Sequence, residues 1–147
     1  MNLMQLDDEP LALVVRRGHP LLMRAAVAIG DLQDFDWVMP EEESLLSQTV
    51  MRWLSNAGYP PPRRWISTSS FLFTLAVLKE TDALAPLARP VVESFAEGMS
   101  MPFVQVPLEM EIAVEAFGIL SRRDAALPPA AERLAAMIVA RSGRSGR

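Results

Sequence analysis

Apolar and polar residues follow one another along the chain in blocks that predict a series of short strands. Residues 11–15 are almost continuously apolar and stop at a Gly-His-Pro turn, and residues 36–39 form a second short run that closes at Pro40. Apolar runs of this length between turn residues are typical of strands. Four further strands are expected, the first of them buried, over residues 63–68, 82–88, 102–108 and 112–123.

Residues 44–57 show the clearest helical periodicity. Their apolar positions fall on one face at helical spacing, and this face comprises Leu45, Leu46, Val50, Trp53, Leu54 and Ala57. Ser44 is a suitable N-cap, and Gly58 supplies a left-handed stop. The carboxylates of Glu41–Glu43 suit the positive end of the helix dipole as a solvated helix start. The alternative is that they discriminate between ligands, because three carboxylates repel an anion.

Three more helices and one short helical turn, near residues 31–34, are predicted. Residues 70–79 are apolar on nearly every side, which predicts a helix that is buried all round. Residues 89–98 carry a proline in their first turn, and residues 127–142 carry an apolar stripe of Ala131, Leu134, Ala135 and Ile138. Because strands alternate with helices, the order predicts an α/β fold with a mostly parallel sheet covered on both faces.

Three segments follow inner strands of this sheet, namely Pro40–Ser44, Thr68–Phe71 and Pro86–Arg89. In open α/β sheets, ligands bind outside the carboxyl ends of the strands. The hydroxyls of Thr68–Ser70 also stand at the start of a helix, where backbone N–H groups favour an anion such as a carboxylate. These hydroxyls either cap the helix alone, or cap it and contact a ligand as well.

The composition excludes several kinds of chemistry. The chain has 147 residues and no cysteine, so disulfides, thiolate zinc sites and cysteine nucleophiles are excluded. His19 is the only histidine and is expected to be a turn residue; a role as a base or a metal ligand is the alternative. The G-x-S-x-G motif is absent. We therefore expect no catalytic residue, no metal, no cofactor and no enzyme activity.

Charge and hydropathy bear on partners and location. The net charge of −4 argues against a grip on a phosphate backbone by this chain. The last residues, "ARSGRSGR", predict a disordered tail, with a nucleic-acid role as the alternative. No apolar run is long enough to span a bilayer, and the first ten residues lack the pattern of a signal peptide. We expect a cytoplasmic protein without membrane contact.

Five segments together resemble the effector-binding, or co-inducer, domain of the LysR-type transcriptional regulators of bacteria. They are "EPLALVVRRGHPL", "DLQDFDWVMP", "AGYPPPR", "STSSFLFTLAVL" and "AFGILSRRDAALPPAAERL", and they run in order from about Glu9 to about Ile138. The resemblance implies a periplasmic-binding-protein-like fold (type 2) of two α/β lobes joined by two crossing strands. A small effector would bind in the cleft between the lobes.

The resemblance also implies a division of the chain. Residues 1–20 would be the first crossing strand and a remnant of the first lobe, and residues 21–110 the complete second lobe. Residues 111–141 would be the return strand and the terminal helix of the first lobe, and residues 142–147 the disordered tail. The helix-turn-helix domain and most of the first lobe would precede Met1, so the parent protein would reach DNA only through the missing domain.

Within the resemblance, the effector contacts of the second lobe match Thr68, Ser69, Ser70, Phe71, Pro86, Leu87 and Ala88. The serines would donate hydrogen bonds, and Phe71 would form an apolar wall. Arg16 would reach the cleft from the crossing strand; the alternative is that Arg16 and Arg17 are a surface pair. The effector would be an organic acid or a sugar. The stretch "KETDALAPLA" departs from the Gly-containing turn of many members, which weakens any transfer of effector identity.

The helix that carries Trp53 resembles the dimer helix of the family. Its partner helix would lie in the missing part, so Trp53 and Leu54 would be exposed and would favour self-association. We expect a homo-oligomer. Two other functions stay open, namely a stand-alone small-ligand binding protein related to periplasmic solute receptors, and a partner-binding or dimerisation fragment that binds no ligand.

Overall fold

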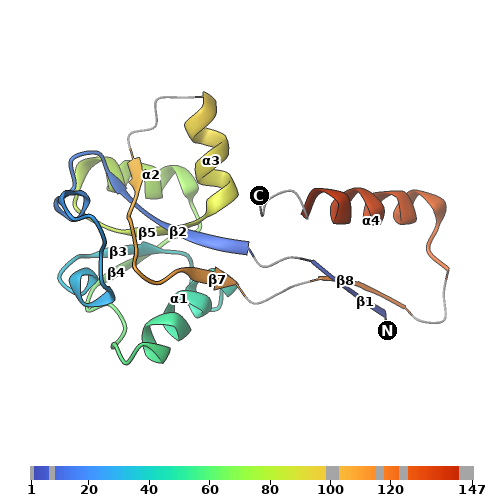
Figure 1. Ribbon diagram of the computed structural model, residues 1–147, viewed down its shortest axis with the longest axis horizontal. Coiled ribbons are helices and arrows are strands. Elements are labelled where there is room, and N and C mark those ends of the chain that lie inside the picture. The colour runs from blue at the N-terminus through green and yellow to red at the C-terminus, as the bar shows by residue number, and fades with distance from the viewer. Residues whose placement is uncertain (1, 7–8, 99–102, 115–117, 123–125, 143–147) are drawn as a thin grey trace. The chain divides into compact units, whose positions relative to one another are not determined.

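The computed structural model describes residues 2–6, 9–98, 103–114, 118–122 and 126–142 (Figure 1). The chain forms two compact units. The larger unit is Pro10–Ala113, which contains the residues expected to form a complete lobe, and the smaller unit joins Met1–Glu9 with Val114–Arg147. The predicted disordered tail lies, apart from residue 142, outside the described residues.

The sheet of the larger unit is built around β2 (Glu9–Arg16). On either side it pairs antiparallel with β5 (Ala85–Ala88) and β6 (Phe103–Gln105), and β7 (Ile112–Val114) also pairs with β2. The prediction of a mostly parallel sheet is therefore wrong for β2. β2 runs between β5 and β6 in the opposite direction, whereas β5 and β6, which α3 connects, run parallel to each other.

The strands that helices connect do run parallel, as predicted. β3 (Trp37–Met39) pairs in parallel with β4 (Trp65–Ser67). A parallel bridge between Trp37 and Leu84 joins β3 to the start of β5, and the N–H of Val38 donates to the carbonyl of Leu84 at 2.8 Å. These contacts place the strands in the order β4, β3, β5, β2, β6, with β4 at one edge.

Helices cover both faces of this sheet. They are α1 (Leu45–Asn56), α2 (Phe71–Glu80) and α3 (Arg89–Gly98). In Figure 1, α1 lies on one side of the strands, and α2 and α3 lie on the other. Crossovers between parallel strands are right-handed. The step from β3 to β4 moves across the sheet in one direction, and the steps from β4 to β5 and from β5 to β6 move in the other. The helix of the first connection therefore lies on the opposite face from the helices of the other two.

The ends of α1 agree with the prediction, whereas the surroundings of its apolar face do not. The Ser44 hydroxyl caps the helix by accepting from the N–H of Ser47 at 3.1 Å, and Gly58 has a φ of +80°. Glu41–Glu43 are exposed ahead of the helix, as expected for a solvated helix start. Trp53 and Leu54 are buried, so the predicted exposed patch is wrong. The face that carries them packs inside the larger unit itself.

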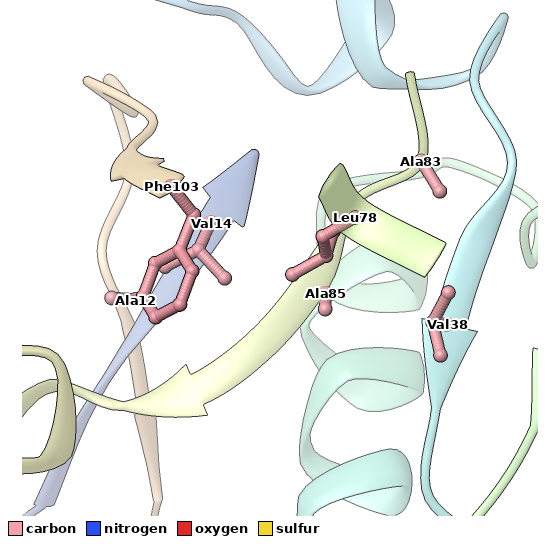
Figure 2. Close-up of a cluster of buried hydrophobic side chains, with 7 residues drawn as sticks. All are labelled: Ala12, Val14, Val38, Leu78, Ala83, Ala85 and Phe103. Carbon is pink, nitrogen blue, oxygen red and sulfur yellow. The ribbon is translucent and has the colours of Figure 1, made fainter. Parts of the chain in front are cut away.

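One part of the core of the larger unit lies between the sheet and α2. Figure 2 shows its buried cluster, which consists of Ala12, Val14, Val38, Leu78, Ala83, Ala85 and Phe103. Only Thr74 and Leu78 of α2 are fully buried, whereas Leu72 is 77% exposed. The prediction of a helix buried all round is wrong, and so is that of a buried β4, whose three residues are exposed. β4 lies at the edge of the sheet, and α2 packs only one of its faces on the sheet.

Two 3₁₀ helices connect β2 to β3, namely η1 (Pro20–Met23) and η2 (Ile29–Leu32), the latter near the predicted helical turn. His19 caps η1, which confirms it as a turn residue. Its Nδ1 accepts from the N–H of Leu21 at 3.1 Å, so its Nε2 carries the proton and donates to the carbonyl of Asp82 at 3.0 Å. The ring is fully buried and ties the end of β2 to the turn that follows α2.

The smaller unit consists of a two-stranded ribbon and a helix. β1 (Asn2–Gln5) pairs antiparallel with β8 (Gly118–Ser121), and α4 (Pro129–Ser142) follows. The single strand predicted over residues 112–123 is two short strands among the described residues, β7 and β8. Of the predicted stripe on α4, Ala135 is buried, whereas Leu134 is 58% exposed.

Candidate functional site

The carboxyl ends of β3, β4 and β5 enclose one pocket of about 200 Å³ in the larger unit. β3 lies between the other two strands, and at β3 the order of the strands changes direction across the sheet. Ligands usually bind at such a switch point in open α/β folds. The pocket is lined by Val38, Pro40, Leu46, Thr68, Ser69, Ser70, Phe71, Thr74, Pro86, Leu87, Ala88 and Val91.

The three segments predicted at the carboxyl ends of the strands thus meet in one place. Pro40 follows β3 directly, and Thr68 follows β4. The N–H of Thr68 donates to the carbonyl of Met39 at 2.9 Å, which holds the two strand ends together. The third segment differs from the prediction in one respect, because Pro86, Leu87 and Ala88 belong to β5 itself and do not follow it.

Of the three hydroxyls at the start of α2, that of Ser70 has the predicted capping role, and that of Thr68 bonds in the turn before the helix. Thr68 Oγ1 accepts from the N–H of Ser70 at 3.1 Å, and Ser70 Oγ accepts from the N–H of Phe73 at 3.3 Å. Both oxygens act as acceptors here, so each O–H proton is available to a ligand. Ser69 forms no hydrogen bond with any described residue. Three hydroxyl donors therefore line one side of the pocket.

The rest of the lining is uncharged. Leu46, Phe71, Leu87 and Val91 form apolar walls, and no acid, base or cation is among the described lining residues. The N-terminal end of the α2 dipole supplies a positive field at the pocket. The arrangement suits a small molecule that has one polar end and an apolar body. It offers no nucleophile with an adjacent base.

Arg16, the eighth predicted contact, lies elsewhere. Its Nε donates to Oδ1 of Asp82 at 2.8 Å, and its Nη2 lies 2.6 Å from the same oxygen. Its Nη1 donates to the carbonyl of Arg17 at 3.1 Å. The guanidinium thus binds the turn after α2, beside the contact that His19 makes there, and is not among the residues that line the pocket.

Four lining residues were missed, namely Val38, Leu46, Thr74 and Val91. Helical spacing from Ser70 could have identified Thr74, whose Oγ1 donates to the Ser70 carbonyl at 3.2 Å. Leu46 and Val91 lie in the first turns of α1 and α3. These two lining residues could have been predicted from their positions in the first turn of a helix that follows a strand, but not from their residue types.

Comparison with known proteins identifies the family. Residues 2–143 match the family model described as the LysR substrate binding domain. The chain belongs to this family, as its motifs indicated. The HTH-type transcriptional regulator GbpR of Azospirillum brasilense is 32% identical over 139 residues, which are 94% of this chain and 40% of that protein. GbpR of Rhizobium radiobacter is 37% identical over 92 residues, which are 63% of this chain and 30% of that protein. The chain therefore spans less than half the length of these relatives.

Solved structures agree on the fold. The Synechocystis PCC6803 CcmR regulatory domain in complex with 2-PG superposes with a TM-score of 0.78 at 17% identity, covering 96% of this chain and 66% of that one. The effector binding domain of QuiR in complex with shikimate gives 0.73 at 12% identity, with coverages of 97% and 66%. The expected α/β, periplasmic-binding-protein-like (type 2) fold is confirmed. None of the described helices has the length and hydropathy of a membrane span.

Proposed function

We propose that the pocket at the N-terminus of α2 binds a small organic effector, and that the chain is the sensing part of a LysR-type transcriptional regulator. The observation that carries the proposal is the convergence of seven predicted contacts on one pocket. Among them, Thr68, Ser69 and Ser70 keep hydroxyl protons that no cap uses. The larger unit would be the second lobe, and the smaller unit would belong to the first.

A hydroxylated organic acid is the effector class that fits this lining best. Its carboxylate would accept hydrogen bonds from Ser69 and Ser70 and would lie near the positive end of the α2 dipole. Its carbon skeleton would contact Phe71 and Leu87. The shikimate bound to QuiR and the 2-PG bound to CcmR support this class. A neutral sugar is the second candidate, since it would also accept from hydroxyls but would gain less from the dipole.

The role in a whole regulator follows from the relatives, which are HTH-type transcriptional regulators. DNA contact would belong to a part outside this chain, whose net charge is −4. The effector would act by binding one arrangement of the regulator more tightly than another, which shifts the population between them. The pocket would perform no catalysis, and the regulator would work in the cytoplasm without a metal or a cofactor.

Calorimetric titration with shikimate, other hydroxylated carboxylates and neutral sugars tests the proposal. For a carboxylate that binds, Ser69→Ala should weaken affinity about tenfold, the loss of one hydrogen bond to a charged group. Leu45→Ala, an exposed change on α1 outside the pocket, is the control and should leave affinity unchanged. Binding of no compound, or binding that Ser69→Ala and Phe71→Ala both leave intact, would overturn the proposal.

A further inference from the structure

Thr74 is the most deeply buried polar residue in the lining of the pocket. It is 9% exposed, and two of its neighbours in the lining, Val38 and Pro86, are buried as well. Ser69 and Ser70, by contrast, are exposed. The pocket therefore has hydroxyl donors at its mouth and the Thr74 side chain at its inner end.

The hydroxyl proton of Thr74 is already used inside α2. Thr74 Oγ1 donates to the Ser70 carbonyl at 3.2 Å, and the same carbonyl accepts from the N–H of Thr74 at 3.0 Å. A hydroxyl oxygen has two acceptor lone pairs besides its proton. No described residue donates to Thr74 Oγ1. The side chain can therefore offer an acceptor to a ligand, but not a donor.

The other end of α2 shows that a threonine oxygen in this state accepts a second bond. Thr81 Oγ1 donates to the carbonyl of Val77 at 2.8 Å, with the same spacing along the chain, and it accepts from the N–H of Ala83 at 3.2 Å. At Thr74 the helix continues, so the neighbouring N–H groups are used by helical carbonyls. A donor for Thr74 Oγ1 then has to come from a molecule in the pocket, either water or a ligand.

We propose that Thr74 accepts a hydrogen bond from a hydroxyl group of the effector, and that it thereby selects a hydroxy acid over the acid that lacks this hydroxyl. The inference rests on the proposed function of the pocket. The three hydroxyls near the mouth keep their protons and suit the carboxylate, which only accepts. An acid without the hydroxyl would displace water from Thr74 and leave a buried acceptor without a donor, which costs free energy.

The geometry of α2 indicates where this hydroxyl lies on the effector. Ser70 and Thr74 both line the pocket, and the four residues between their positions correspond to about 6 Å along the helix axis. The hydroxyl should therefore lie several bonds from the carboxylate, as on a small ring. A pocket of about 200 Å³ suits such a molecule, since sites for drug-sized ligands have roughly 300–1,000 Å³.

Calorimetric titration with matched acids tests the role of Thr74. The isomers of hydroxycyclohexanecarboxylate carry both groups on one ring, and cyclohexanecarboxylate lacks the hydroxyl. The wild-type chain should bind the best isomer at least about fivefold more tightly than cyclohexanecarboxylate, the net contribution of one neutral hydrogen bond. Thr74→Val keeps the shape of the side chain without its hydroxyl. It should abolish this preference and leave the affinity for cyclohexanecarboxylate unchanged.

Two control variants separate ligand contact from a structural role. Thr74→Ser restores the hydroxyl and should restore the preference. Thr81→Val removes the corresponding bond to the helix at the other end of α2, outside the pocket, and should leave both affinities unchanged. The N–H of Thr74 still donates to the Ser70 carbonyl in Thr74→Val, so the start of α2 should keep its position. Circular dichroism checks the folding of each variant.

The possible failures can be told apart. Equal binding of the two acids by the wild-type chain, or a preference that Thr74→Val leaves intact, would overturn the role of Thr74 and leave the proposed function standing. A preference lost in both Thr74→Ser and Thr74→Val would also overturn it, because the threonine methyl group would then be responsible. If neither these acids nor any compound of the first titration binds, the proposed function fails and this inference fails with it.

Discussion

The two compact units differ in how much of their apolar surface they cover themselves. In the larger unit, the sheet and α2 enclose a cluster of seven buried residues, and Leu13, Leu32 and Leu54 are completely buried. In the smaller unit, Leu6, Val114 and Ala135 are the buried hydrophobic residues among those described. Ile119 is half-buried. The exposed large apolar side chains of this unit are Leu3, Met4, Leu120, Leu127, Leu134, Met137, Ile138 and Val139.

The difference shows which unit holds a core of its own. Hydrophobic burial is the main favourable term in folding, and a two-stranded ribbon with one helix covers little surface. The chain covers 66% of each of the two solved domains described above.

The largest effect is expected from the core of the larger unit. Leu78→Ala should lower the free energy of unfolding by about 2–5 kcal/mol, because it leaves a cavity in the buried cluster. Leu134→Ala, on the exposed side of α4, is the matched control and should change it by less than about 0.5 kcal/mol. Urea unfolding monitored by circular dichroism measures both. An equal cost for the two variants would contradict the contrast between the units.

Gly118 offers a way to disturb the smaller unit alone. A Cβ at this position would clash with the backbone carbonyl oxygen of Met4 across the ribbon. Gly118→Ala should therefore separate β1 from β8 at a cost of about 1–3 kcal/mol. Hydrogen exchange should show loss of protection in these two strands and unchanged protection in β2, β3 and β5. Faster exchange throughout the larger unit would mean that the units do not fold separately.

His19 is expected to stabilise the larger unit through hydrogen bonds and not through apolar packing. His19→Ala removes the cap of η1 and the bond to the Asp82 carbonyl, and it leaves both groups without their partner. The loss should be about 1–3 kcal/mol. His19→Asn provides a comparison, since its side-chain oxygen can accept from the N–H of Leu21. An Asn variant as unstable as the Ala variant would show that the cap contributes little.

The smallest effects should separate capping from ligand contact at α2. Ser70→Ala removes a cap and should cost about 1 kcal/mol of stability. Ser69→Ala removes a hydroxyl that no described residue uses and should change stability by less than about 0.5 kcal/mol. Thermal unfolding without ligand compares the two. A destabilised Ser69→Ala variant would mean that Ser69 has a structural role, and its loss of affinity could then not be assigned to ligand contact.

Much of the candidate site could be predicted, because its parts depend on local chemistry. Hydroxyl residues directly before a helical run indicate an N-cap whatever surrounds them, and Ser70 is the N-cap of α2. Because ligands bind at the carboxyl ends of parallel strands, Pro40 and Pro86 were expected at one site, and both line the pocket. Arg16 could not be placed in this way, because its partner Asp82 is 66 residues away in the sequence.

The sequence by itself determined where the longer helices begin and end to within about two residues, that the strands joined by helices run parallel, and which family the motifs resemble. Those features depend on capping, on turn residues and on connections between neighbours in the chain. Only the tertiary structure decided which sides of an element are covered. α2 is apolar on nearly every side, yet one face packs on the sheet and the other is exposed. Both faces carry apolar residues, and burial depends on segments that are distant in the sequence.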